Sequence, residues 1–129
     1  MILNKNELKE IRGDASFRVF YRKKNLKNTS IIVYANKEKK KNLLIYDAIN
    51  KILIKNKILA PKLYNEEYNK NFIEIEDFGN DTIFDLLKRK GSKSIVLYKN
   101  SIKLLNKIQK IKQKKIRNFN GKFYKIPTY

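Results

Sequence analysis

A short stretch near the amino end combines residue types that could bind a phosphate group. Gly13 allows a tight turn, and the Ser16 hydroxyl and the Arg18 guanidinium follow it closely. Backbone N–H groups at such a turn can approach an anion, and an arginine can add charge-assisted hydrogen bonds. The stretch contains neither a Walker A pattern nor a Gly-x-Gly-x-x-Gly pattern. By itself it favours an ordinary turn that leads into a strand.

Two missing residue types exclude other kinds of chemistry. The 129 residues include no Cys, so a disulfide framework, a thiolate nucleophile and a Cys-bound zinc are excluded. They include no His, which removes the usual general base near neutral pH and every Ser-His-Asp arrangement. No apolar leader follows Met1, and the longest uninterrupted apolar run, residues 31–35, is too short to span a bilayer. We therefore expect a reduced, cytoplasmic chain of one domain, or part of a larger protein.

The charge is high and unevenly distributed. Lys and Arg number 31 against 12 Asp and Glu, a formal net charge of +19, and Asp85 is the last acidic side chain. The Lys-rich segment 88–125 therefore offers one alternative function, a small basic nucleic-acid-binding module. Against this, no base-reading motif of arginines and aromatic residues is visible. The abundance of Lys, Ile, Asn and Tyr also matches residues with A/T-rich codons.

Hydrophobic patterns predict the elements of the first half. Residues 16–22 and 30–35 are rich in β-branched and aromatic side chains and flank a polar turn, which predicts an antiparallel hairpin. Before it, residues 4–10 read as a short helix or a lead-in. Apolar residues at helical spacing predict a helix over residues 38–56.

The second half predicts two strands and then two helices. Residues 62–66 and 72–75 read as strands, and the alternation in the second places Glu74 and Glu76 on its solvent face. After a turn, Asn80 or Asp81 could cap a helix that ends at Gly91. A long helix over residues 94–115 carries five residues on its expected buried face, Ile95, Tyr98, Ile102, Leu105 and Ile108. Strands and helices segregated in this way predict an α+β fold, an antiparallel sheet with one packed helix.

The stretch Gly-Asp-Ala-Ser-Phe-Arg at residues 13–18 resembles the nucleotide-binding loop of the aminoglycoside phosphotransferase/choline kinase superfamily, a protein-kinase-like family. The likeness is closest to the anomeric N-acetylmuramate/N-acetylglucosamine sugar kinases. Four further segments match the family pattern in order: residues 31–35 the third strand, 60–64 the segment after the first helix, 73–79 the strand and hinge, and 82–87 the helix beyond the hinge.

The resemblance implies a set of ATP-binding residues. They are Gly13, Asp14, Ala15, Ser16 and Arg18 at the phosphates, and Glu76, Asp77 and Phe78 at the hinge, where backbone groups would recognise adenine. The third strand lacks the lysine that kinase-like folds generally place there, and the following helix offers only Asp47 as its acidic partner. Arg18 or Lys37 could replace that lysine, and we favour Arg18. Arg22 lies farther from the loop, and we expect it to matter little.

The resemblance also implies a division of the chain and a missing half. Residues 1–79 would be the nucleotide-binding lobe and hinge, and residues 80–129 the start of a truncated helical lobe. The catalytic residues and the Mg²⁺ ligands of the family lie in that second lobe, in a His-Gly-Asp loop and beyond it. We therefore expect no catalytic or metal-binding residue in this chain and no activity of the chain alone. The complete enzyme would transfer phosphate from ATP to a sugar hydroxyl, in cell-wall sugar salvage.

Overall fold

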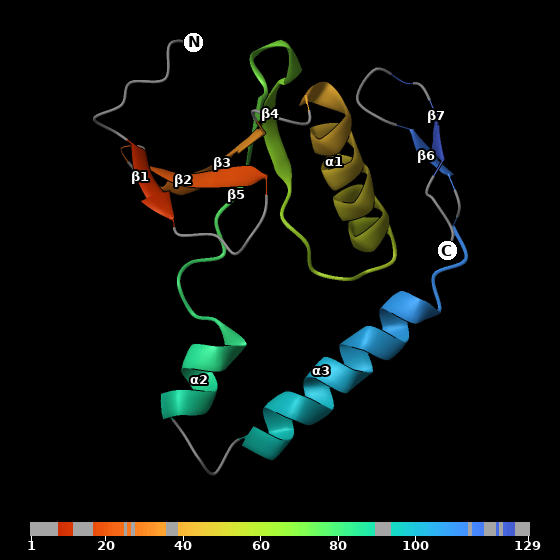
Figure 1. The fold of residues 1–129 in the computed structure, drawn as a ribbon. Helices are drawn as coiled ribbons and strands as arrows, with labels where there is room; N and C mark the ends of the chain where they lie inside the picture. Colours follow the sequence, from red (N-terminus) through yellow and green to blue (C-terminus); the bar gives the residue numbers. More distant parts are fainter. Residues whose placement is uncertain are drawn as a thin grey trace.

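A computed structural model describes residues 8–11, 17–24, 26, 28–35, 39–89, 94–113, 115–117, 121 and 123–125. Its largest unit is a five-stranded sheet, drawn in red to green in Figure 1. The strands are β1 (Leu8–Ile11), β2 (Arg18–Lys24), β3 (Thr29–Ala35), β4 (Leu63–Glu67) and β5 (Phe72–Glu76). A 3₁₀ turn, η2 (Tyr68–Lys70), joins β4 to β5.

The sheet is antiparallel throughout, in the spatial order β1-β2-β3-β5-β4. Helix α1 (Lys39–Lys55) leaves the end of β3 and returns the chain to the far edge at β4. The predicted hairpin is confirmed as β2 and β3, with Phe20 opposite Val33. The α+β class is confirmed as well, because one sheet is built from short antiparallel strands with a single helix packed beside it (Figure 1).

The hydrophobic core lies between α1 and one face of this sheet. Side chains of β3 and β5 alternate, so every second residue meets the helix. Seven buried residues form the core cluster: Ile31, Val33, Ala35, Leu43, Tyr68, Ile73 and Ile75. Partly buried residues extend it toward β1 and β2: Ile11, Phe20, Leu44, Tyr46 and Leu63. Phe20 of β2 and Ile75 of β5 therefore lie on the same face of the sheet, the face toward α1.

The first predicted element is wrong. The described part of residues 4–10 is strand, because β1 pairs with β2 and places Ile11 opposite Phe20. Leu8 and Ile11, three residues apart, suited a helix turn equally well in the sequence. Pairing with β2 decides the conformation of residues 8–11. Residues 12–16, between the two strands, lie outside the described part of the chain.

Two helices follow the sheet. Helix α2 (Ile83–Arg89) is capped by Thr82, whose Oγ1 accepts the Asp85 N–H at 3.1 Å, so the expected cap at Asn80 or Asp81 is wrong. The expected end at Gly91 lies outside the described residues. Helix α3 (Ser94–Gln109) is shorter than predicted, and Lys115–Arg117 form strand β6 instead, paired with β7 (Phe123–Lys125).

The apolar stripe of α3 is exposed, contrary to the expectation of a buried face. Its five residues are between 37% and 65% exposed: Ile95, Tyr98, Ile102, Leu105 and Ile108. Figure 1 shows α3 standing apart from the sheet, beside α2. Among the helices of the described residues, none combines the length and the apolar character that crossing a membrane requires.

Candidate functional site

A pocket opens beside the α1 face of the sheet, where β5 ends and the chain turns toward α2. Its volume is about 300 Å³, and apolar side chains from the sheet, α1 and the segment before β4 form most of its wall: Ile11, Phe20, Ile31, Tyr46, Pro61 and Ile75. The segment from Glu76 to Asn80 forms the remaining side, together with Arg22 and Thr82. An apolar slot with a few polar groups at one edge is the usual form of a small-molecule site.

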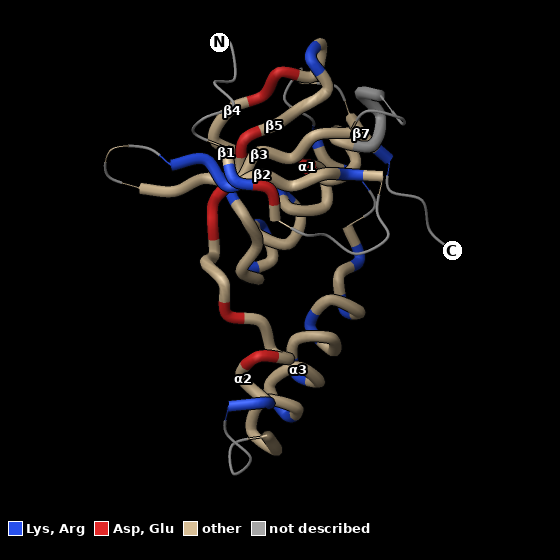
Figure 2. Tube along the Cα trace, turned by 60° about the vertical axis from the view of Figure 1, so that its left-hand side comes forward, with Lys and Arg blue, Asp and Glu red and all other residues tan. Residues whose placement is uncertain are grey.

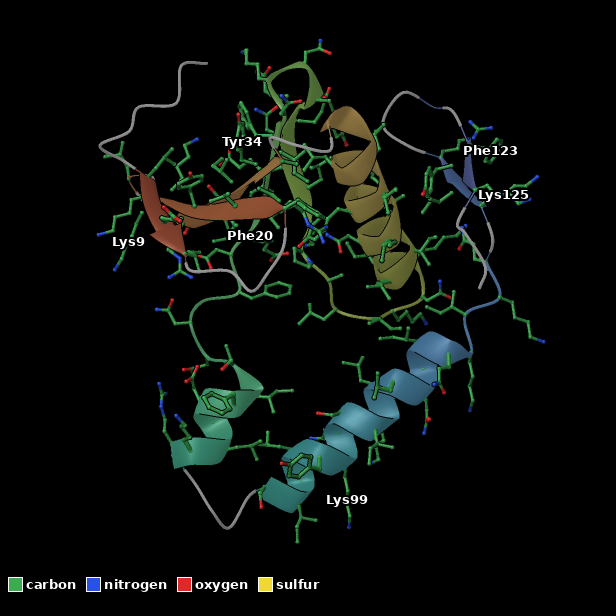
Figure 3. All side chains as sticks on the ribbon, viewed as in Figure 1. Lys9, Phe20, Tyr34, Lys99, Phe123 and Lys125 are labelled. Carbon is green, nitrogen blue, oxygen red and sulfur yellow. The ribbon has the colours of Figure 1, made fainter. Side chains whose placement is uncertain are left out.

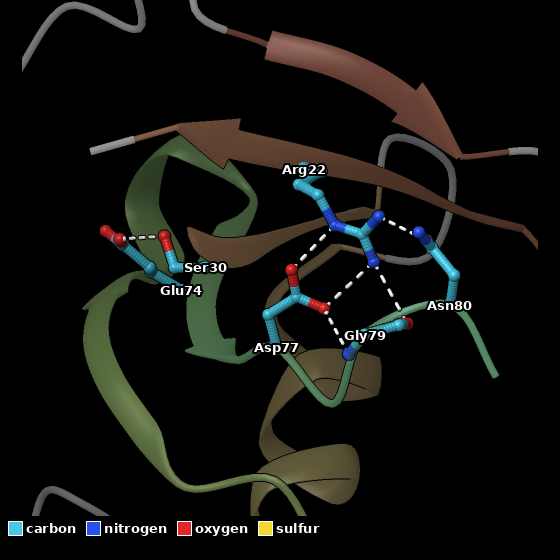
Figure 4. Close-up of polar contacts among 6 residues, drawn as sticks. All are labelled: Arg22, Ser30, Glu74, Asp77, Gly79 and Asn80. Atoms are coloured by element: carbon cyan, nitrogen blue, oxygen red, sulfur yellow. Dashed lines mark hydrogen bonds and ion pairs between the residues drawn. The ribbon is translucent and has the colours of Figure 1, made fainter. Parts of the chain in front are cut away.

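Arg22 of β2 ties this segment to the sheet (Figure 4). Its guanidinium binds the Asp77 carboxylate in two places, Nε to Oδ2 at 2.6 Å and Nη2 to Oδ1 at 2.9 Å. Nη2 also donates to the Gly79 carbonyl oxygen at 3.0 Å, and Nη1 donates to the Asn80 side-chain oxygen. Paired bonds of this kind fix both the position and the plane of the carboxylate. Arg22 therefore makes four hydrogen bonds to the segment that follows β5, contacts that the sequence did not indicate.

Gly79 makes the turn of this segment possible. Its φ is +86°, a conformation that residues with a Cβ rarely adopt. Its N–H donates to Asp77 Oδ1 at 2.8 Å, so the carboxylate holds the turn from one side and Arg22 from the other. The Asp77 carboxylate thus accepts hydrogen bonds from both Arg22 and the Gly79 N–H.

These contacts change the acidity of Asp77. Burial on its own would raise the pKa of Asp77, whose side chain is only 3% exposed. Hydrogen bonds from Arg22, Thr29 and Gly79, with the Arg22 charge, outweigh burial, so the pKa of Asp77 lies below its ordinary value. The carboxylate consequently remains charged at neutral pH.

The lowered pKa predicts how stability depends on pH. We expect Asp77→Asn to reduce the free energy of unfolding at pH 7 by about 1.5–3 kcal/mol, because charged hydrogen bonds are lost. This difference from wild type should be complete above the unfolded-state pKa of about 3.9 and should disappear as pH falls through the lower folded-state pKa. Urea unfolding between pH 3 and pH 7 measures it.

Asp81→Asn is the matched control for this experiment. Asp81 pairs with Arg89 at 3.0 Å, but both side chains are 62% exposed, and such pairs contribute only about 0–1 kcal/mol. A difference between wild type and Asp77→Asn that stays constant across the whole pH range would contradict the assigned role of the charge.

The structure places the predicted nucleotide-binding residues in two groups. Glu76, Asp77 and Phe78 line the pocket together, and Phe78 is half exposed at its rim. Arg18 begins β2, and its guanidinium lies over the Tyr46 ring, 5.0 Å from the ring centre. Tyr46 is one of the residues that line the pocket. Arg18 contacts Tyr46 but is not itself part of the lining. The other predicted residues, Gly13, Asp14, Ala15 and Ser16, lie outside the described residues, as does Lys37.

Asp47, the acidic residue of α1, does not line the pocket. Asp47 is buried and accepts a hydrogen bond from Lys51 at 2.5 Å, one helical turn away. Burial and the charges of Asp47 and Glu66 raise the pKa of Tyr68, so its hydroxyl stays protonated. Asp47 therefore interacts with the partly exposed Lys51 and the buried Tyr68, and it does not line the pocket.

The expectation that Glu74 lies on the solvent face of its strand is wrong. It is 8% exposed and lies on the sheet face opposite α1, where it accepts the Ser30 hydroxyl at 2.5 Å. Lys23 Nζ approaches the same carboxylate at 3.3 Å. Glu76 is half-buried, and its side chain accepts the Lys62 N–H at 3.3 Å while its backbone N–H donates to Lys62 O. Both glutamates stabilise the sheet around the site.

The sequence assigned a binding role to only three of the residues that line the pocket, Glu76, Asp77 and Phe78. The polar and aromatic lining residues that it missed are Phe20, Arg22, Tyr46, Asn80 and Thr82. Arg22 and Asp77 are separated by 55 positions, so no local pattern joins them. Tyr46 lies in the apolar helix pattern, where an aromatic residue gives no sign of a site.

Within the described residues, no group of three or more Asp, Glu, Cys or His side chains could hold a metal ion. Searches of protein-family models, curated proteins and solved structures returned no match to this chain.

Proposed function

We propose that the chain is the nucleotide-binding lobe of a small-molecule kinase, with the pocket at the hinge as the adenine site. Phosphoryl transfer from ATP to a sugar hydroxyl would then occur in a protein that combines this lobe with a catalytic lobe carrying the Mg²⁺ ligands. The observation that carries the proposal is the coincidence of the pocket with the segment from Glu76 to Phe78, which the sequence assigned to the hinge.

The shape and lining of the pocket support a flat aromatic ligand. Phe20, Ile31 and Ile75 present apolar surface from three adjacent strands, on which a purine ring can lie. The backbone of Asp77 and Phe78 borders the same space and would hydrogen-bond to the edge of the base. The antiparallel order β1-β2-β3-β5-β4, with a helix between the third and fourth strands, also agrees with the antiparallel sheet and one packed helix that we expect of such a lobe.

The spacing along β2 supports a nucleotide rather than a free base. Arg18, Phe20 and Arg22 alternate and therefore share the face that carries the pocket. Arg22 holds the hinge end, and Arg18 lies about 13 Å away at the end next to residues 12–16, from the strand rise of about 3.3 Å per residue. Base and phosphates of an extended nucleotide could occupy these two ends, with Phe20 between them.

Binding to this chain alone should be weak. Exposed ion pairs contribute only about 0–1 kcal/mol, and the described residues provide no metal site to neutralise a triphosphate. The test is saturation-transfer NMR with AMP, GMP and UMP. We expect transfer to the adenine protons of AMP, and much less in Phe20→Ser. Phe123→Ser, on the exposed strand β7 away from the pocket (Figure 3), is the matched control.

Equal transfer to all three nucleotides, or an AMP signal unchanged in Phe20→Ser, would contradict an adenine site at the hinge. Circular dichroism first establishes that both variants keep the wild-type fold.

A basic surface supports the alternative of nucleic-acid binding. In Figure 2 most acidic residues of the described part lie on the sheet, the hinge and α2, with Asp47 on α1, whereas α3 carries only basic charges. Lys99, Lys103 and Lys107 are exposed along it, and Lys110 is exposed directly after its end. A steep dependence of DNA or RNA binding on salt, lost when these lysines become glutamine, would favour this alternative.

A further inference from the structure

The contacts of Arg22 reach every part of the turn that follows β5. One guanidinium binds the Asp77 carboxylate, the Gly79 carbonyl and the Asn80 side chain, from a strand two positions away in the sheet. Arg22 is 18% exposed and Asp77 3%, so water competes little for the bonds between them, whereas the bonds to Gly79 and Asn80 are exposed. The segment that leads to α2 is thereby fastened to β2 and not only to its own strand.

Only an arginine can make this set of contacts. Its planar group offers five N–H donors in fixed directions, and here Nε, Nη1 and Nη2 all donate. A lysine would keep the positive charge but could not bind both carboxylate oxygens and the Gly79 carbonyl at once. Arg22 therefore fixes the position of the hinge backbone through directed hydrogen bonds, in addition to the attraction of its positive charge.

We infer that Arg22 is a positioning residue, which sets the hinge backbone at the distance from the sheet that the adenine ring requires. The inference rests on the proposed function for its ligand. Because four of its five N–H donors are committed to this segment, we expect Arg22 to contribute nothing specific to phosphate binding. Its loss should weaken AMP and ATP binding by the same factor.

The experiment combines amide hydrogen exchange with nucleotide titrations, both followed by NMR. The variants are Arg22→Met, Arg22→Lys and the matched control Lys24→Met, at the exposed end of the same strand. We expect Arg22→Met to accelerate exchange of the Gly79 amide about tenfold and to weaken AMP and ATP binding about equally. Arg22→Lys should fall between wild type and Arg22→Met, and Lys24→Met should match wild type.

The amide of Ile73, buried in β5, separates local positioning from general stability. An equal acceleration at Ile73 and Gly79 would reduce Arg22 to a stabilising contact, and unchanged exchange at Gly79 would overturn the inference outright. A larger loss of ATP than of AMP binding would assign Arg22 to the phosphates instead. If wild type binds neither nucleotide, the proposed function fails and the adenine role fails with it, while the Gly79 exchange still shows whether Arg22 holds the hinge.

Discussion

Arg18→Ala is expected to lower kcat/KM for phosphoryl transfer by about tenfold to a hundredfold in a kinase that contains this lobe. In a closed site, a charge-assisted hydrogen bond to phosphate contributes about 1.5–3 kcal/mol, which corresponds to that range. Arg18 begins β2 directly after the segment expected to hold the phosphates, and the Tyr46 ring supports its guanidinium. A coupled assay of ADP release, with amino sugars as acceptors, measures the change.

Arg89→Ala is the matched control for Arg18. Arg89 ends α2, its side chain is 62% exposed, and it does not line the pocket. Its replacement should leave kcat/KM within about twofold, as expected for a solvent-exposed ion pair. Equal activity of wild type and Arg18→Ala would remove Arg18 from the phosphate site. Residues 13–16 would then be an ordinary connection between two strands.

Ile73→Ala is expected to produce the largest loss of stability, about 2–5 kcal/mol in the free energy of unfolding. Ile73 has no exposed surface, and β5 lies between β3 and β4 in the sheet. Removal of its side chain leaves a cavity in the layer between the sheet and α1, where few neighbours can move to fill it. Urea unfolding followed by circular dichroism measures the difference.

Ile95→Ala makes the same type of change at an exposed position. Ile95 on α3 is 65% exposed, so its replacement should alter the free energy of unfolding by less than about 0.5 kcal/mol. A similar loss for both variants would contradict the division between the packed sheet and the exposed helix. It would mean that α3 contributes to the same core.

The strongly patterned elements could be predicted from the sequence. The β-branched run of β3 and the apolar spacing of α1 each admit one conformation, and both elements were predicted within one residue at each end. Strands β4 and β5 were also predicted within one residue at each end, β5 from its alternation of apolar and acidic residues. The hinge segment could be assigned only through the family resemblance. The pocket lies beside this segment, and the assignment itself stays a prediction.

The remaining features depend on contacts between distant segments. Strand β6 forms because Ile116 lies opposite Tyr124, whereas the predicted helix ended at Lys115 and no element was predicted beyond it. Glu74 is buried because Ser30 and Lys23 from two other strands meet it. Arg22 became part of the site for the same reason, since its partners lie more than fifty positions away. Local periodicity carries no information about such pairs.

The most direct test of the adenine site is a map of amide and methyl chemical shifts of the isotope-labelled chain during titration with AMP. We expect the amides of Phe78 and Gly79 to shift together with the methyl groups of Ile11, Ile31 and Ile75, because these groups surround one pocket. The shifts should saturate in the millimolar range. Shifts confined to the lysines and apolar residues of α3, or none at the hinge at saturating AMP, would contradict the account.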